Sequence, residues 1–466
     1  MLGHAPSSAL KKLICLHLAK GILNYIELRL QPARSSMIEN QRRLIYYYAV
    51  NALSWSAVGL YTVSLSWLVL ATTHKASSVG FFYLLASASS LLISPFLGPL
   101  LGKSKYTIFL ILASAIVRSV ALSIPLLLAA LNVGAASSLV FLVAIFFGPS
   151  NSVFGAASEG MMLRSWSAEH RSAIARRAGL IRQISLAIGF SSAGFLVAEF
   201  DSQTTSAIAA FSGITSALIC LRFGNPEVAP TAISYQRSYL SRLTDGIASM
   251  RSNPVLLLPC VVATLGFSAS QMSNALLAPI VTSQQKAANE FGWITSAWAV
   301  GAITAALLMN LISVKSNKVL NWFLPLLLLG LLSIVFSHTR STTAQIGLFM
   351  AMGAIFSYLR ISSGTKIALH TPSQDIAKVQ LTLSNLISLT ALFVYAIPWL
   401  LKSLAPALIF SIWGITIIVV SFCMLLSLKF FDKGDICAQA PASAMARGEQ
   451  AGQDEASHSP ALPKAR

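Results

Sequence analysis

Long apolar runs alternate with short polar stretches along this chain, and we count twelve such runs. Each is about 20 residues or longer, which lets a helix cross a hydrocarbon layer of roughly 30 Å at 1.5 Å per residue. The runs are Leu44 to Ala71, Val79 to Leu101, Tyr106 to Leu131, Ala135 to Ser158, Ala178 to Phe200, Thr204 to Leu221, Pro254 to Val281, Phe291 to Val314, Val319 to Ser337, Ala344 to Ile367, Val379 to Leu401 and Leu404 to Leu428. The pattern predicts an all-α membrane protein with six spanning helices on either side of a polar stretch, Arg222 to Asn253.

The composition agrees with a chain embedded in lipid. Hydrophobic residues make up 55% of the 466 residues, charged residues make up 10%, and the mean hydropathy is +0.70. So few polar side chains cannot coat a water-soluble globule of this size. We therefore expect the lipid bilayer to be the main surroundings of the protein.

The formal net charge of +18 raises the possibility of a nucleic-acid partner. The basic residues argue against it, because they lie between the apolar runs. They concentrate in alternate connections, at Arg42, Arg43, Lys103, Lys105, Arg164, Arg171, Arg176, Arg177, Arg222, Arg237, Arg242, Arg251, Lys315, Lys318, Lys366, Lys378, Lys429 and Lys433. The other connections hold only Lys75, Lys286, Arg340 and Lys402. Since basic residues near helix ends stay on the cytoplasmic side, we expect both termini in the cytoplasm.

The two sets of six runs resemble each other. An alignment without gaps of Val79 to Ser104 with Phe291 to Ser316 pairs Gly80 with Gly292 and Lys103 with Lys315. A parallel repeat of six-helix halves, with the substrate between them near the midplane, is one way to build a secondary transporter, although coincidence can also produce so weak a match. We expect these parts: a cytoplasmic leader (1–42), a first half (43–221), a cytoplasmic central loop (222–253), a second half (254–430) and a disordered cytoplasmic tail (431–466).

Two interpretations of the leader stay open. Leu10 to Leu30 is apolar but interrupted by charges, which is typical of an interfacial helix with basic residues at the lipid headgroups. Alternatively, translation starts at Met37, directly before Gln41-Arg42-Arg43.

Several segments resemble the major facilitator superfamily, and within it the bacterial exporters of siderophores such as enterobactin and of macrolides. The similarity covers about Gln41 to Lys433. It is carried by Trp67-Leu68-Val69-Leu70, by Pro95 to Lys103, by Phe147-Gly148-Pro149-Ser150-Asn151 and by Gln183 to Gly189.

The resemblance implies a monomeric secondary transporter in the cell inner membrane, and no enzymatic activity. It implies export of a siderophore or a similar small organic molecule from the cytoplasm, in exchange for protons. A multidrug or macrolide efflux pump is the alternative, and an importer or a non-transporting scaffold also stays open. The fifth helix departs from the antiporter pattern, because Phe190 follows Gly189 where that pattern has proline. Proton exchange is therefore implied by the family and not by an intact motif.

The loop after the second helix departs from the family pattern as well. In the family, an acidic residue there helps to latch one conformation. Here Gly102 stands at the position of the acid, and Lys103 stands at the position of an arginine. We expect a latch that involves Gly98, Lys103 and the counterpart Lys315, and that is weaker or differently built.

Ionisable residues inside the spans are candidates for transport, because charges are costly there. Arg118 lies midway along the third run, and we expect it to face the cavity and attract an anionic substrate. The alternative is a structural pairing with a neighbouring helix. Glu159, at the cytoplasmic end of the fourth run, is the candidate for proton coupling. Its alternative is an interfacial ion pair with Arg164.

Polar residues within other spans suggest further members of the substrate pathway. They are Asn51, Ser54, Gln271, Asn274 and Arg360. The first four lie in the first and seventh helices, which line the central cavity in the resembled fold. For each, interhelical packing or, for Arg360, snorkelling to the interface is the competing explanation. For Arg182 and Gln183 we expect a place at the cytoplasmic surface, with a position along the pathway as the alternative.

The sequence gives little support for an ATP-driven pump, for an enzyme or for a metal-binding protein. Gly98 to Ser104 is one residue short of a phosphate-binding loop and ends an apolar helix, so an ATP-driven pump is not indicated. The histidines are dispersed and form no catalytic constellation. The five cysteines lack metal-ligand spacing. We expect no cofactor and no metal.

Overall fold

The computed structural model describes residues 36–101, 106–130, 137–166, 168–222, 254–311, 320–370 and 376–431. Its helices are α2 (Ser36–Thr73), α3 (Ala76–Leu101), α4 (Thr107–Ala130), α5 (Ser137–Ser165), α6 (Ala168–Glu199), α7 (Ser202–Leu221), α9 (Pro254–Ser283), α10 (Ala288–Leu311), α11 (Leu320–His338), α12 (Thr342–His370), α13 (Ile376–Leu400) and α14 (Pro406–Phe431). Within this part of the chain, twelve helices are long and apolar enough to cross a membrane, which confirms the predicted fold class.

Two helices begin earlier than the apolar pattern predicts. Helix α2 starts at Ser36 rather than near Leu44, and α6 starts at Ala168 rather than near Ala178. A helix satisfies its own backbone hydrogen bonds and therefore does not have to end where the apolar run ends. Polar residues with good helix propensity, such as Glu39, continue it. The earlier start of α6 places its arginines deeper along the helix than the sequence suggested.

The two groups of six helices pack in the same way. In the first half, α2 packs on α6 and α7, α4 packs on α5 and α7, and α3 packs on α5. In the second half, α9 packs on α13 and α14, α11 packs on α12 and α14, and α10 packs on α12. Each pair in the first half has its counterpart in the second half at the same position in the order of helices. The halves are therefore pseudo-symmetric, as predicted.

Large apolar side chains cover the outer surface of the helices. Leu92, Phe211 and Phe393 are 72%, 70% and 68% exposed. Small hydroxyl residues lie inside: the hydroxyls of Ser64 in α2 and Ser206 in α7 are 3.0 Å apart. Because lipid is as apolar as leucine, close approach and hydrogen bonding between helices hold such a bundle together.

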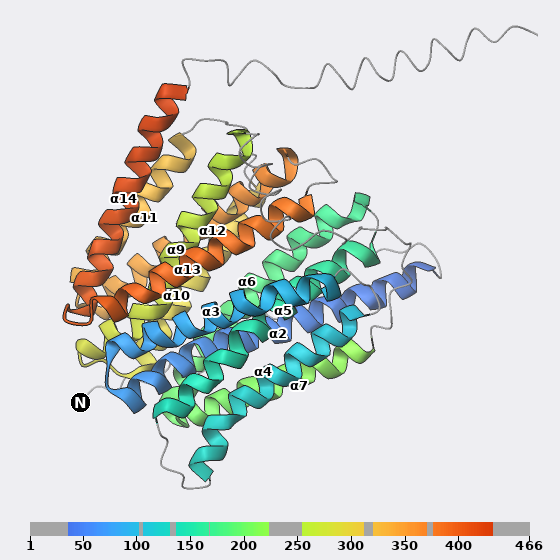
Figure 1. Cartoon of the computed structure of the whole chain (residues 1–466), viewed down its shortest axis with the longest axis horizontal. Helices are drawn as coiled ribbons and strands as arrows, with labels where there is room; N and C mark the ends of the chain where they lie inside the picture. Colours follow the sequence, from blue (N-terminus) through green and yellow to red (C-terminus); the bar gives the residue numbers. More distant parts are fainter. Residues whose placement is uncertain are drawn as a thin grey trace, which may run out of the picture.

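The two halves meet at one end of the bundle, which we call the closed end. It carries the connections at residues 74–75, 200–201, 284–287, 339–341 and 401–405. There Gly194 of α6 contacts Gly292 of α10 so closely that a Cβ on either residue would overlap the backbone of the other. A Cβ on Gly80 of α3 would lie 3.0 Å from a ring carbon of Pro398 in α13. In Figure 1 the halves converge at the lower left and spread apart toward the upper right.

Candidate substrate cavity between the halves

A cavity lies between the two halves, with a volume of about 950 Å³ including the open space at its mouth. Its walls come from α2 and α6 of the first half and from α9, α10 and α12 of the second half. A cavity between repeats is where a transporter built from two such halves binds its substrate.

Each half contributes one arginine to the cavity, and each arginine lies over an aromatic ring. The guanidinium carbon of Arg182 in α6 is 3.6 Å from the ring centroid of Trp55 in α2. The guanidinium carbon of Arg360 in α12 is 5.5 Å from the ring centroid of Phe267 in α9. Both are cation–π contacts, which hold each guanidinium at the wall of the cavity.

The two aromatic platforms occupy equivalent positions in the repeat. The ungapped alignment that pairs Gly80 with Gly292 also pairs Trp55 with Phe267, and it pairs Thr62 with Asn274. All four of Trp55, Thr62, Phe267 and Asn274 line the cavity. The repeat therefore presents the same face of α2 and α9 to the substrate space.

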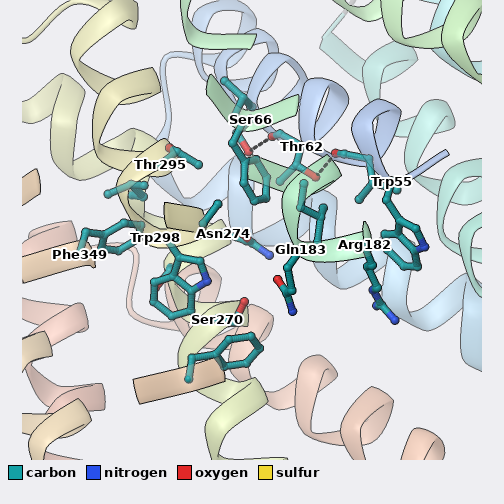
Figure 2. A pocket seen from close by; sticks show the side chains of 18 of the residues that line it. Trp55, Thr62, Ser66, Arg182, Gln183, Ser270, Asn274, Thr295, Trp298 and Phe349 are labelled. Carbon is teal, nitrogen blue, oxygen red and sulfur yellow. Dashed lines mark hydrogen bonds between the residues drawn. The ribbon is translucent and has the colours of Figure 1, made fainter. Parts of the chain in front are cut away.

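Aromatic residues form the wall on the second half. Trp298 of α10 lies 5.3 Å from Phe356 and 5.0 Å from Phe349, measured between ring centroids, and Phe267 lies 5.5 Å from Phe356. Figure 2 shows Phe349 and Trp298 on one side of the cavity and Arg182 with Trp55 on the other side. Such rings offer flat apolar surface against which a ring-containing ligand can stack.

Polar groups without charge complete the lining. Thr62 and Ser66 donate their hydroxyls to backbone carbonyls one turn earlier, at Val58 and Thr62, as drawn in Figure 2. Their oxygens keep lone pairs that can accept from a ligand. Gln183, Ser270 and Asn274 also face this space. Among the described residues that line the cavity none is acidic, so its side chains carry two positive charges and no negative one.

The cavity ends toward the closed end at two pairs of aromatic rings. Tyr83 of α3 stacks on Tyr395 of α13 with centroids 5.3 Å apart and planes at 24°. The Tyr83 hydroxyl donates to the Thr62 carbonyl oxygen at 3.1 Å and lies 2.8 Å from the Ser66 hydroxyl. Trp67 and Phe291 form the second pair, 5.7 Å apart. These contacts join the halves directly behind the cavity.

Of the residues proposed for the substrate pathway, Asn274 and Arg360 line this cavity, and Asn51, Ser54 and Gln271 do not. The Asn51 amide donates to the Tyr47 carbonyl oxygen and accepts from the Ser158 hydroxyl. The Ser54 hydroxyl lies 2.7 Å from that of Ser216. The Gln271 amide donates to the Ile387 carbonyl oxygen at 3.3 Å. In this conformation, these three follow the packing alternative.

Arg118 does not line the cavity either. It lies inside the first half, 1% exposed, with its guanidinium carbon 5.2 Å from the Phe154 ring centroid. A charge at the centre of a membrane helix costs at least about 2.5 to 3.5 kcal/mol. A desolvated cation–π contact returns about 2 kcal/mol of this. The predicted position of Arg118 in the cavity is therefore not what this conformation has, because α4 packs between α5 and α7, away from the second half.

Several sequence predictions lie outside the described residues. They are Lys103 and Lys315 of the latch, the burial of Gly98, the side chain of Glu159, residues 1–35 of the leader, residues 223–253 of the central loop and residues 432–466 of the tail.

Sequence reasoning placed Arg182 and Gln183 at the cytoplasmic surface, but both line the cavity. Because α6 begins at Ala168, Arg182 lies about 20 Å along the helix axis at 1.5 Å per residue. The signal that was available is the run of polar residues with good helix propensity before Ala178, which lengthens the helix. The described residues contain no group of three or more His, Cys, Asp or Glu side chains that could hold a metal ion.

Several solved protein structures are similar to this architecture. No curated protein sequence matches the chain significantly. Among solved structures, it is similar to a bacterial homologue of the human lysosomal transporter Spinster in an inward-facing, unoccupied conformation, with a TM-score of 0.61 and 12% identity over 86% of this chain and 99% of that one. It is also similar to the nucleoside transporter NupG, with a TM-score of 0.61 and 13% identity over 82% of this chain and 99% of that one. A POT family transporter in complex with 5-aminolevulinic acid matches with a TM-score of 0.61 and 12% identity, over 82% and 95% of the two chains.

These structures share the fold of this chain, and their low identity carries no information about its substrate. The sequence itself is more specific, because the sequence model of the Major Facilitator Superfamily matches residues 47–386. With twelve membrane-length helices in two pseudo-symmetric halves around a central cavity, the chain belongs to the Major Facilitator Superfamily of membrane transporters.

Proposed function

We propose that this protein exports a small anionic organic molecule of the siderophore class from the cytoplasm, in exchange for protons. The observation that carries the proposal is the cavity with Arg182 and Arg360 on opposite halves and no acidic residue in its described lining. Guanidinium groups bind carboxylates and other planar anions through paired N–H donors. The aromatic walls suit a ligand with rings, such as a catecholate.

The direction of transport rests on the orientation of the chain. If the basic connections lie in the cytoplasm of a cell with an inner membrane, the closed end faces away from the cytoplasm. The cavity then opens toward the cytoplasm, where an exporter takes up its substrate. We propose that the protein works as a monomer, since each half supplies one wall of the same cavity.

The alternative function is efflux of drugs such as macrolides. The aromatic residues of the cavity suit ring-containing drugs as well. The two arginines favour the anionic substrate, because a cationic drug would lie beside like charges, which costs affinity.

The energy source that we propose is proton exchange with Glu159 as the proton carrier. A carboxyl group in a span is a candidate because burial raises the pKa of such groups into the range where they can exchange protons. For the latch, we propose that Gly98, Lys103 and Lys315 act at the cytoplasmic ends of the second and eighth spanning helices.

Inside-out membrane vesicles test the function, because their outer surface is the cytoplasmic one. We expect the wild-type protein to accumulate a labelled catecholate siderophore when the vesicle lumen is acidic. Arg182→Gln and Arg360→Gln should each lower the rate about tenfold or more, since a hydrogen bond to a charged group contributes about 1.5 to 3 kcal/mol. Glu159→Gln should remove the dependence on the pH gradient.

Arg340→Gln is the matched control for charge, because Arg340 is exposed at the closed end and does not line the cavity. It should transport at the wild-type rate. Accumulation of a macrolide in place of the siderophore would establish the efflux alternative. Accumulation of neither, in vesicles that hold folded protein, would contradict the proposed function.

A further inference from the structure

Arg118 is a buried cation for which the first half supplies no anion. Its side chain is 1% exposed. No acidic residue among the described ones pairs with it, and its Nε and Nη1 atoms have no hydrogen-bond partner there. An arginine does not lose its proton inside a protein, so the positive charge persists. The Phe154 ring, 5.2 Å away, offsets only part of the cost of burying that charge.

The third nitrogen of Arg118 has a partner that cannot neutralise it. Nη2 is 3.5 Å from the hydroxyl oxygen of Ser54. Ser216 donates its hydroxyl to the Val50 carbonyl oxygen at 3.0 Å, so the 2.7 Å contact between Ser54 and Ser216 uses the proton of Ser54. Ser54 therefore accepts from Arg118 with a neutral oxygen, and this hydrogen bond leaves the charge uncompensated.

A second unsatisfied group lies beside the first. The Tyr61 hydroxyl, on α2, is buried beside the guanidinium of Arg118, for which its oxygen is a neutral acceptor, and its O–H finds no acceptor among the described residues. Tyr61 is 0% exposed. Two helices thus bring the guanidinium of Arg118 and the O–H of Tyr61 to one place, and the acceptors beside the guanidinium, the hydroxyl oxygens of Ser54 and Tyr61, are neutral. Buried polar groups in native proteins are nearly always satisfied, so this cluster is suited to a ligand that accepts hydrogen bonds and carries negative charge.

We propose that Arg118 and Tyr61 form a binding site for a monatomic anion, chloride under physiological conditions, inside the first half. A bound water would bring donors of its own and no charge, whereas a halide accepts from every donor present and neutralises the guanidinium. The cluster does not line the cavity, and its side chains are almost fully buried, so it is too enclosed for an organic substrate. The site is therefore separate from the anion-binding arginines of the cavity.

The proposed anion site lies where several helices of the first half meet. Arg118 lies in α4, its partners Ser54 and Tyr61 lie in α2, and Phe154 lies in α5. Helix α7 is close as well, because a Cβ on Gly213 would lie 3.8 Å from the Nη2 atom of Arg118. An anion here neutralises a charge at the junction of four helices, so its binding stabilises the packing of the first half.

Thermal unfolding of the purified full-length protein tests the site. We expect the melting temperature to rise with chloride or bromide concentration and to saturate, compared with gluconate at equal ionic strength, because a ligand that binds only the folded state stabilises it. Tyr61→Phe keeps the ring and removes one donor, and it should weaken the apparent halide affinity about tenfold. Arg118→Met should abolish the halide response.

Two variants separate this site from the cavity. Arg182→Gln and Arg360→Gln should keep the halide-dependent rise, since these arginines line the cavity and not the buried cluster. The proposal would be overturned if Arg182→Gln and Arg360→Gln both lost the halide-dependent rise in melting temperature while Tyr61→Phe kept it. Equal melting temperatures in chloride and gluconate would overturn it too.

Crystals grown in bromide give a readout that does not depend on the stability of any variant. We expect an anomalous scattering peak within hydrogen-bond distance of Nε or Nη1 of Arg118. A map of the wild-type protein that shows ordered water there, and no bromide peak, would contradict the anion site. Transport activity does not enter these measurements, so their outcome is independent of the proposed function.

Discussion

Arginine, which is costly to place in a membrane, occurs in two different environments in this protein. Arg182 and Arg360 lie over aromatic rings in the wall of a cavity. Arg118 lies inside the first half, beside groups that offer it no negative charge. We propose that the same side chain serves recognition in one place and, with a bound anion, packing in the other.

The aromatic platforms should contribute to substrate affinity through their arginines. We expect Trp55→Leu and Phe267→Leu each to raise the apparent KM for the anionic substrate about two- to tenfold, because each loses a cation–π contact of about 0.5 to 1 kcal/mol or more. The kcat should change less, since the guanidinium remains. Vesicle uptake at varied substrate concentrations measures both constants.

Trp293→Leu is the matched control for the loss of a large ring. Trp293 is 55% exposed and does not line the cavity. Its apparent KM should equal that of the wild type. An unchanged KM in both Trp55→Leu and Phe267→Leu would show that the platforms do not hold the arginines for binding.

At the scale of helices, the crossing of α6 and α10 decides whether the closed end can close. The backbones of Gly194 and Gly292 touch there, and no side chain fits between them. The stack of Tyr83 on Tyr395 joins α3 and α13 at the same end. These two crossings are the places where a change of conformation has to separate the halves.

Gly292→Ala should therefore shift the conformational equilibrium away from closure at this end. The added Cβ overlaps the backbone of Gly194, which cannot give way as a flexible side chain would. Because the overlap exists only in the closed conformation, the population of the open one rises. Distances between spin labels across the closed end should show a larger fraction of long separations than in the wild type.

Gly347→Ala, in α12, makes the same chemical change where an added Cβ meets nothing within 4 Å. It should leave the distance distribution unchanged. If Gly292→Ala gives the wild-type distribution while the protein remains folded, the glycine contact does not control closure.

At the scale of the whole molecule, orientation links the cavity to the direction of transport. The two halves converge at the end that carries Lys402 and diverge toward the end that we expect in the cytoplasm (Figure 1). The chain can then release its substrate on the far side only after the closed end opens. This alternation follows from a single cavity shared by two halves.

A membrane-impermeant thiol reagent tests this orientation in a variant whose five cysteines are replaced by serine. Gln183→Cys, in the cavity, should react only from the cytoplasmic side. Lys402→Cys, at the closed end, should react only from the opposite side. Reaction with the two sides exchanged would reverse the proposed orientation and direction of loading.

The sequence by itself determined the twelve helices, the pairing of the halves and the family resemblance. Apolar runs of membrane length must be helical, because lipid offers no other partner for the backbone polar groups. The sequence also proposed Arg360 and Asn274 for the substrate pathway, and both line the cavity.

Only the tertiary structure decided which way the other polar residues face. Both the lipid and the interior of a membrane bundle are apolar, so the hydrophobic pattern of a spanning helix does not distinguish its cavity side from its packed side. For this reason Arg118, midway along its run, appeared as a cavity residue, while Arg182 appeared as a surface residue. The packing of α4 between α5 and α7, and of α6 against α2 and α10, placed Arg118 inside the first half and Arg182 in the cavity wall.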